Sequence, residues 1–107
     1  MRHRTVMIEL SSKQKAELRA VAQRIKPAVH VGKGGVSEGV VRELVLAFKE
    51  NELIKVAFSA HRDEMATLIE VVEKATESLC VGGVGKKRSF YRPMTEEELA
   101  AKKPSRG

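Results

Sequence analysis

Apolar and polar positions alternate between helical and strand periods along residues 10–92. One stripe with helical spacing predicts a helix over about residues 13–25, beginning after Ser11-Ser12 and comprising Leu18, Val21, Ala22 and Ile25. This helix ends before Pro27, because the residue that precedes a proline disfavours the α region. The β-branched run that follows predicts a short strand over residues 28–31.

Two further helices and three strands complete the pattern. Ser37 is a favoured N-cap residue, and the apolar periodicity after it predicts a helix that Asn51 ends. Residues 53–59 are nearly all apolar apart from Lys55, which is typical of a central strand covered on at least one face. A third helix is expected to start near Asp63, with a buried stripe of Met65, Leu68, Ile69, Val72 and Ala75. A last pair of antiparallel strands is expected over residues 79–84 and 87–92, joined by a turn at Gly85-Lys86.

The order α-β-α-β-α-β-β predicts the fold class α/β (α+β), with a mixed four-stranded sheet packed with helices. A single domain is expected over residues 1–94, followed by a flexible C-terminal tail over residues 95–107. Thr95 to Glu98 resembles a capping box, but Leu99 is the only apolar anchor there, so a helix would be marginal. Residues 102–107 are expected to be disordered.

Composition limits the setting in which the protein works. No apolar run approaches the roughly 18 residues of a membrane span, so no membrane association is expected. The single cysteine, Cys80, excludes an internal disulfide and favours a reducing compartment, most simply the cytoplasm. The net charge of +6 favours a polyanionic partner.

The charge is unevenly distributed along the chain. Residues 1–26 carry seven Lys and Arg against two Glu, a net of +5, and residues 78–92 carry four Lys and Arg and no acid, a net of +4. Residues 62–77 carry five acids against two bases, a net of −3. Two interpretations stay open: separate solvated faces, or one continuous basic surface.

The segment from Val31 to Glu38 combines three glycines and one lysine between the first strand and the second helix. Glycine permits backbone angles closed to other residues and lets a partner approach the backbone closely. Free N–H groups at a helix N-terminus attract phosphate, and Lys33 adds a full positive charge. The segment therefore predicts a contact site for a phosphate backbone, although a merely tight turn stays open.

Two nucleotide-binding fingerprints fail on spacing. The run that starts at Gly32 begins like G-x-G-x-x-G, but its sixth position is Ser37. Gly85-Lys86 is similar to the end of a phosphate-binding loop, yet the position five before Gly85 is Cys80 and a strand follows. What survives is a four-residue G-x-x-G pattern at a helix start, a pattern that clamps the nucleic-acid backbone in another RNA-binding module.

Three blocks of the sequence resemble the signature blocks of the CRM domain (chloroplast RNA splicing and ribosome maturation), in particular its stand-alone bacterial YhbY-like members. They are Lys26-Pro27, the run from Val31 to Val40, and the run from Glu52 to Val56, in matching order and spacing. The resemblance covers about residues 10–92. It implies a fold similar to the C-terminal domain of translation initiation factor three, and RNA binding through a GxxG loop formed by Gly32, Lys33, Gly34 and Gly35. It also implies association with precursors of the large ribosomal subunit, so that the expected partners are large-subunit ribosomal RNA or its precursor and pre-ribosomal particles.

Basic residues of the first helix and the last strand are expected to support that loop by holding phosphates: Lys13, Lys15, Arg19, Lys86, Lys87 and Arg88. Phe90 and Tyr91 point to opposite faces of the last strand, so one is expected in the core and the other is a candidate for stacking on a base.

The sequence does not predict an enzyme, a cofactor or a metal site. His3, His30 and His61 lack metal-type spacing, and a thiol in an apolar strand such as Cys80 is inert. The prediction is a small RNA-binding protein that assists ribosome assembly. Two alternatives stay open: an enzyme that binds a small phosphorylated ligand at the same loop, and a protein-interaction adaptor whose acidic third helix docks a basic partner.

Overall fold

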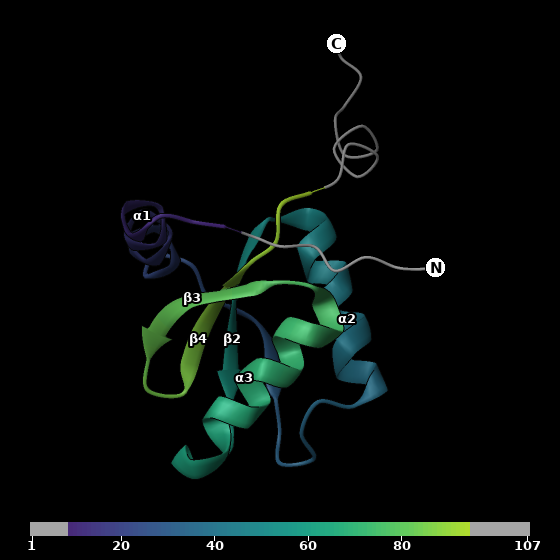
Figure 1. Cartoon of the computed structure of the whole chain (residues 1–107). Coiled ribbons are helices and arrows are strands. Elements are labelled where there is room, and N and C mark those ends of the chain that lie inside the picture. The colour runs from purple at the N-terminus through teal and green to yellow at the C-terminus, as the bar shows by residue number, and fades with distance from the viewer. Residues whose placement is uncertain (1–8, 95–107) are drawn as a thin grey trace.

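A computed structural model describes residues 9–94 of the chain, with the elements shown in Figure 1. In chain order they are α1 (Ser12–Ala22), β1 (Pro27–Val31), α2 (Glu38–Glu50), β2 (Leu53–Phe58), α3 (Arg62–Thr76), β3 (Leu79–Val84) and β4 (Lys87–Tyr91). The order expected from the periodicity is confirmed. The capping box expected at Thr95 and the disorder expected over residues 102–107 lie outside the described residues.

The four strands form one mixed sheet in the order β1-β2-β4-β3. β1 and β2 are parallel and are joined through α2, whereas β4 runs antiparallel to both β2 and β3. The predicted final hairpin is therefore present, and its second strand lies inside the sheet between β2 and β3. The register between β3 and β4 shifts between Cys80 and Gly82, which bends the edge strand.

Alternation along β2 separates two faces of the sheet. Ile54, Val56 and Phe58 are buried against α2 and α3, and the intervening positions turn to the opposite face. The core cluster is Val29, Val31, Leu44, Phe48, Ile54, Val56, Phe58, Ala60, Met65, Val72 and Phe90. Fully buried residues such as Leu44 and Phe48 each contribute about 1.5–3 kcal/mol to folding.

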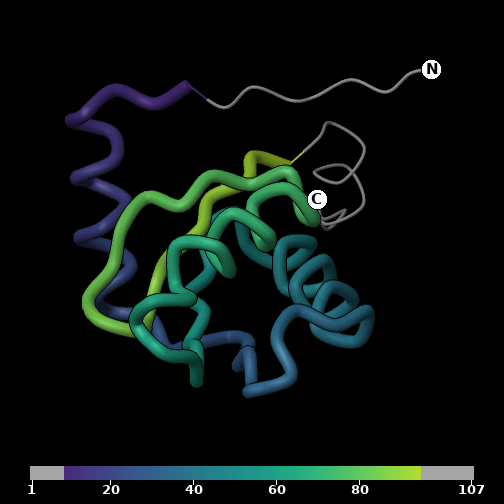
Figure 2. Tube along the Cα trace, turned by 60° about the horizontal axis from the view of Figure 1, so that its bottom comes forward, coloured from purple at the N-terminus to yellow at the C-terminus, as the bar shows by residue number. Residues whose placement is uncertain are grey.

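α1 lies alone on the other side of the sheet, where it packs against β3 and β2 (Figure 2). Ser11 caps it as predicted: the Ser11 hydroxyl accepts from the Gln14 N–H at 3.1 Å, and the Gln14 side chain accepts from the Ser11 N–H at 2.8 Å. The expected apolar stripe is less buried than its spacing suggests. Ala22 is buried, whereas Val21 is 52% exposed, so α1 contacts the sheet through a narrow line of residues.

Two element predictions need correction. α1 ends at Ala22 and not near Ile25, because residues 23–25 tighten into a turn in which the Arg24 and Ile25 N–H groups donate to the carbonyls three residues back. On α3, Ala75 is exposed and Thr76 is buried in its place. The Thr76 hydroxyl donates to the Val72 carbonyl at 2.7 Å, so its hydrogen-bonding capacity is satisfied although the side chain is buried.

The predicted ends of α2 are confirmed. The Ser37 hydroxyl accepts from the Val40 N–H at 3.2 Å, and the Asn51 N–H donates to the Ala47 carbonyl where the helix stops. Within residues 9–94, every helix is too short or too polar to cross a lipid bilayer.

Candidate nucleic-acid interface

The glycine segment forms a compact turn between β1 and α2, which we call the GxxG turn (residues 32–35). The Gly35 N–H donates to the Gly32 carbonyl at 3.0 Å, which leaves Lys33 and Gly34 at the tip. Gly35 has a φ of +81°, in the region that favours glycine, whereas Gly34 does not have a positive φ. The positive φ of this turn therefore belongs to Gly35 and not to Gly34.

The turn leaves room and donors for an anion. Apart from each glycine and its two chain neighbours, no described atom lies within 4 Å of the position that a Cβ would take at Gly32, Gly34 or Gly35. Among residues 9–94, the N–H groups of Lys33 and Gly34 have no hydrogen-bond acceptor, while the Gly35 N–H is occupied within the turn. Two backbone donors and one exposed ammonium group thus lie together at the tip.

Three segments meet at the end of the sheet that carries the GxxG turn. The Ser59 N–H donates to the Val31 carbonyl at 2.9 Å, which ties the end of β2 to the end of β1. The Phe58 N–H donates to the Lys86 carbonyl at 2.9 Å, which brings the β3–β4 turn to the same end. β1 and β4 are two strand spacings apart, about 10 Å, so the GxxG turn and the β3–β4 turn flank one short edge.

A groove of ≈ 660 Å³ runs between α1 and the sheet, and we call it the basic groove. α1 contributes Arg19, Ala22 and Gln23, and the sheet contributes Lys55, Gly83, Val84, Lys86, Lys87 and Ser89. Four of these residues are cationic and none is acidic. Lys55 pairs with Ser89 and Ala57 pairs with Lys87 across β2 and β4, so both lysines rise from the sheet face opposite the core.

Arg19 has a structural role in this groove. Its Nη1 donates to the Val81 carbonyl at 3.1 Å, and its aliphatic stem crosses Gly82, where any Cβ would collide with it. A side chain at position 82 would displace Arg19 from this contact, and the φ of +132° at Gly82 also favours glycine. No acceptor among the described residues meets the other N–H groups of the Arg19 guanidinium, which can donate to a ligand.

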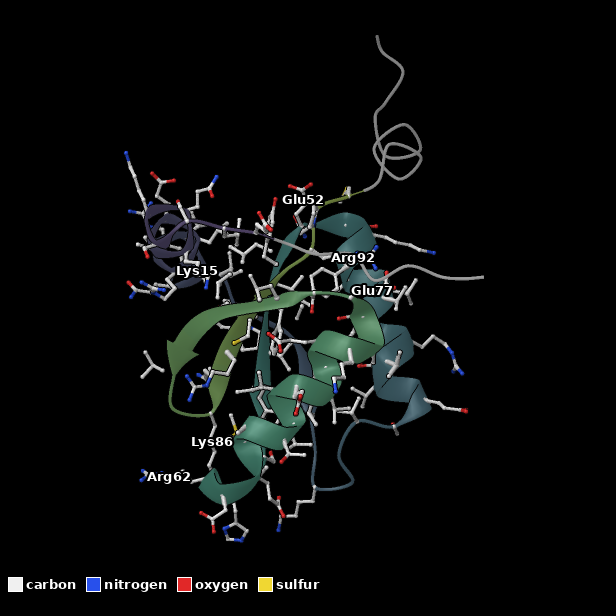
Figure 3. The ribbon with its side chains drawn as sticks, viewed as in Figure 1. Lys15, Glu52, Arg62, Glu77, Lys86 and Arg92 are labelled. Atoms are coloured by element: carbon white, nitrogen blue, oxygen red, sulfur yellow. The ribbon has the colours of Figure 1, made fainter. Side chains whose placement is uncertain are left out.

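The structure brings together only part of the basic set expected from the sequence. Arg19, Lys86 and Lys87 line the basic groove. Lys15 lies on α1 (Figure 3), one helical turn before Arg19, and is not among the described residues that line the groove. Lys13 lies about 160° around the helix from Lys15, on the outer face of α1. Arg88 pairs with Val56 on the opposite face of β4, and its Nη1 donates to the Gly83 carbonyl at 3.3 Å.

Lys55 is the groove residue that the sequence analysis missed. It stood out only as an interruption in an apolar strand. Side chains alternate along a strand, so a lysine between the core residues Ile54 and Val56 must lie on the opposite face of the sheet. The sequence therefore contained the information needed to place Lys55 on that face.

The two neighbouring aromatic residues separate as expected, one in the core and one outside it. Phe90 is fully buried, with its ring 6.4 Å from that of Phe58. Tyr91 is half-buried on the α1 side, at the end of β4 far from the GxxG turn. Burial, and then the nearby Glu52 carboxylate, raise the pKa of Tyr91. Stacking of Tyr91 on a base stays a prediction.

The single cysteine of the chain, Cys80, lies on β3. Burial raises the pKa of the half-buried Cys80 thiol, which favours its unreactive protonated form. The Cys80 N–H donates to the Glu73 carboxylate at 2.7 Å. Within residues 9–94, no group of three His, Cys, Asp or Glu side chains is placed to hold a metal ion.

Comparison with known proteins gives a consistent set of relatives. Residues 10–92 match the family model described as the CRS1 / YhbY (CRM) domain. A protein of Haemophilus influenzae named RNA-binding protein is 34% identical over 94 residues, which cover 87% of this chain and 95% of that protein. The Bacillus subtilis protein YqeI, named a probable RNA-binding protein, is 31% identical over 90 residues, which cover 83% of this chain and 94% of YqeI.

A solved structure has the same fold. The solution structure of a Staphylococcus aureus protein, described as a candidate RNA-binding protein, superposes with a TM-score of 0.73 at 34% identity. The match covers 82% of this chain and 93% of that protein.

Proposed function

Because the chain belongs to the CRS1/YhbY (CRM) domain family, we propose that it binds RNA and assists assembly of the large ribosomal subunit in the cytoplasm. Its relatives in Haemophilus influenzae and Bacillus subtilis are named as RNA-binding proteins. The bound species are large-subunit ribosomal RNA or its precursor, within pre-ribosomal particles.

One observation carries the proposal: the GxxG turn and the basic groove open at the same end of one sheet. The turn presents the Lys33 ammonium group and two backbone N–H groups that no acceptor in the described part of the chain occupies. The groove presents Lys86 and Lys87 toward this end of the sheet and Lys55 further along β2, and none of its described lining residues is a carboxylate. Cationic groups spread in this way can contact several phosphates of one RNA strand, whereas a single small anion would contact only a few of them.

Binding begins at the tip of the GxxG turn, where one phosphate accepts hydrogen bonds from the Lys33 and Gly34 N–H groups. The open space over Gly32 and Gly34 lets the RNA backbone approach closely. Lysines of the basic groove neutralise phosphates further along the strand. Contacts of this kind position the RNA and are tolerant of its sequence, so specificity comes from RNA shape.

Cross-linking in living cells followed by sequencing of the bound RNA tests this function. Enrichment of large-subunit ribosomal RNA over small-subunit and messenger RNA is expected. Binding of mononucleotides without binding of RNA would support the enzyme alternative, and a protein complex that survives nuclease treatment without any cross-linked RNA would support the adaptor alternative. Either result overturns the proposal.

A further inference from the structure

A second cleft lies on the other side of the β3–β4 turn, between that turn and the first half of α3, and we call it the hairpin cleft. Its volume is ≈ 650 Å³, within the range of small-molecule sites. The α3 side contributes Arg62, Met65, Ala66 and Ile69, and the hairpin contributes Lys86 and Arg88. Arg62 and Lys86 come from distant parts of the chain and lie close together at this end of the molecule (Figure 3).

The cleft has an apolar floor and a cationic rim. Ala66 and Ile69 follow Arg62 by four and seven residues, so the three share one face of α3. The acids of the first turn, Asp63 and Glu64, lie about 100° and 200° around the helix from Arg62. Three cations therefore lie around an apolar surface, and none of the lining residues within 9–94 is a carboxylate.

One buried donor in the cleft wall lacks a partner. Among residues 9–94, the Arg88 Nε has no hydrogen-bond acceptor although it is shielded from solvent, and the Nη1 of the same side chain donates to the Gly83 carbonyl. A buried unpaired donor on a cation is costly, so the Arg88 side chain gains a hydrogen bond if it turns toward the cleft and donates to an acceptor held there.

We propose that the hairpin cleft receives one unpaired nucleotide of the bound RNA. The base lies on the apolar surface of Ala66 and Ile69, the adjacent phosphate lies between Arg62 and Lys86, and an acceptor of the nucleotide meets the Arg88 side chain. An unpaired base can be turned out of an RNA strand and read in this way, whereas a paired base cannot. This inference rests on the proposed RNA binding and adds the class of RNA: structured RNA with an extruded nucleotide.

The position of Lys86 connects this cleft to the basic groove. Lys86 lines both the basic groove and the hairpin cleft, which lie on opposite sides of the β3–β4 turn. An RNA strand that leaves the basic groove can therefore pass around the turn and enter the hairpin cleft while it stays in contact with Lys86. Free phosphate alone would leave the apolar floor unused.

The test compares two RNA hairpins that differ by one bulged uridine, using the full-length chain. The parent protein is expected to bind the bulged hairpin about fivefold more tightly, as one base contact gives. Ala66→Glu fills the cleft from an exposed helical position, and its affinities for the two RNAs should become equal. Thr67→Glu makes the same change of charge at the next exposed position of α3, outside the cleft, and should keep the preference. Circular dichroism verifies that both variants are folded.

Equal affinity of the parent for the two hairpins would overturn this inference and leave the proposed function intact. If Ala66→Glu still prefers the bulged hairpin, this inference is also overturned and the proposed function is left intact, because the bulged base would then bind outside the hairpin cleft. Failure of the parent to bind either RNA would overturn the proposed function, and this inference with it.

Discussion

Replacing Gly35 with alanine tests the geometry of the GxxG turn. Gly35 has a φ of +81° and closes the turn through its N–H group. An L-residue in this region costs about 1–2 kcal/mol. Contacts with more distant residues should neither add to this cost nor offset it, because no described atom beyond the two chain neighbours lies within 4 Å of the new Cβ. In a domain of this size, each kcal/mol lowers Tm by about 4–8 °C.

Thermal denaturation followed by circular dichroism measures the effect against a matched control. Gly34→Ala adds the same methyl group in the same turn, where φ is not positive and the space is also open. Its Tm should stay unchanged or rise slightly, because alanine restricts the unfolded chain. Gly35→Asn should recover part of the loss, since asparagine tolerates the left-handed region better. Equal Tm values for Gly35→Ala and Gly34→Ala would refute the described turn.

Three further predictions concern charge, the tail and the thiol. Replacing both Lys55 and Lys87 with alanine should reduce the slope of log affinity for RNA against log salt by about 1.4–1.8, and an unchanged slope would mean that the basic groove does not contact phosphate. Removing residues 95–107 should leave Tm nearly unchanged, because Leu99 is their main apolar anchor; a fall of several degrees, about 1 kcal/mol, would contradict this. Because burial raises its pKa, Cys80 should react with iodoacetamide more slowly in the folded protein than in urea at the same pH, and equal rates would show that the thiol is not protected.

The order of the elements could be predicted because its signals are local. Periodicity, the capping residues and Pro27 act over a few neighbouring positions, and they also identify the GxxG turn. The docking of α1 depends on its partner surface and could not be predicted. Its apolar stripe suggested burial of Val21, whereas the contact is made by Ala22 and by Arg19 crossing Gly82.

The features of the candidate interface that depend on one helix or strand could be predicted from the sequence, and those that depend on packing between elements could not. Alternation along β4 shows that Lys87 and Arg88 face opposite ways, but only the pairing with β2 decides which of them joins the basic groove. Helical geometry already separates Lys13 from Lys15. The hairpin cleft had no signal in the sequence, because Arg62 and Lys86 become neighbours only when α3 and the β3–β4 turn pack together.

The effect of Gly34→Asp on RNA affinity tests the central claim most directly. Gly34 lies at the tip of the GxxG turn without a positive φ and with open space around it, so the variant should fold like the parent. Its carboxylate would lie where a phosphate has to approach. The Gly34→Ala control adds bulk without charge, so the difference between the two variants gives the effect of the charge. Filter binding to large-subunit ribosomal RNA fragments should show a large loss for Gly34→Asp and a small one for Gly34→Ala. A folded Gly34→Asp protein that binds RNA as tightly as the parent would contradict the account.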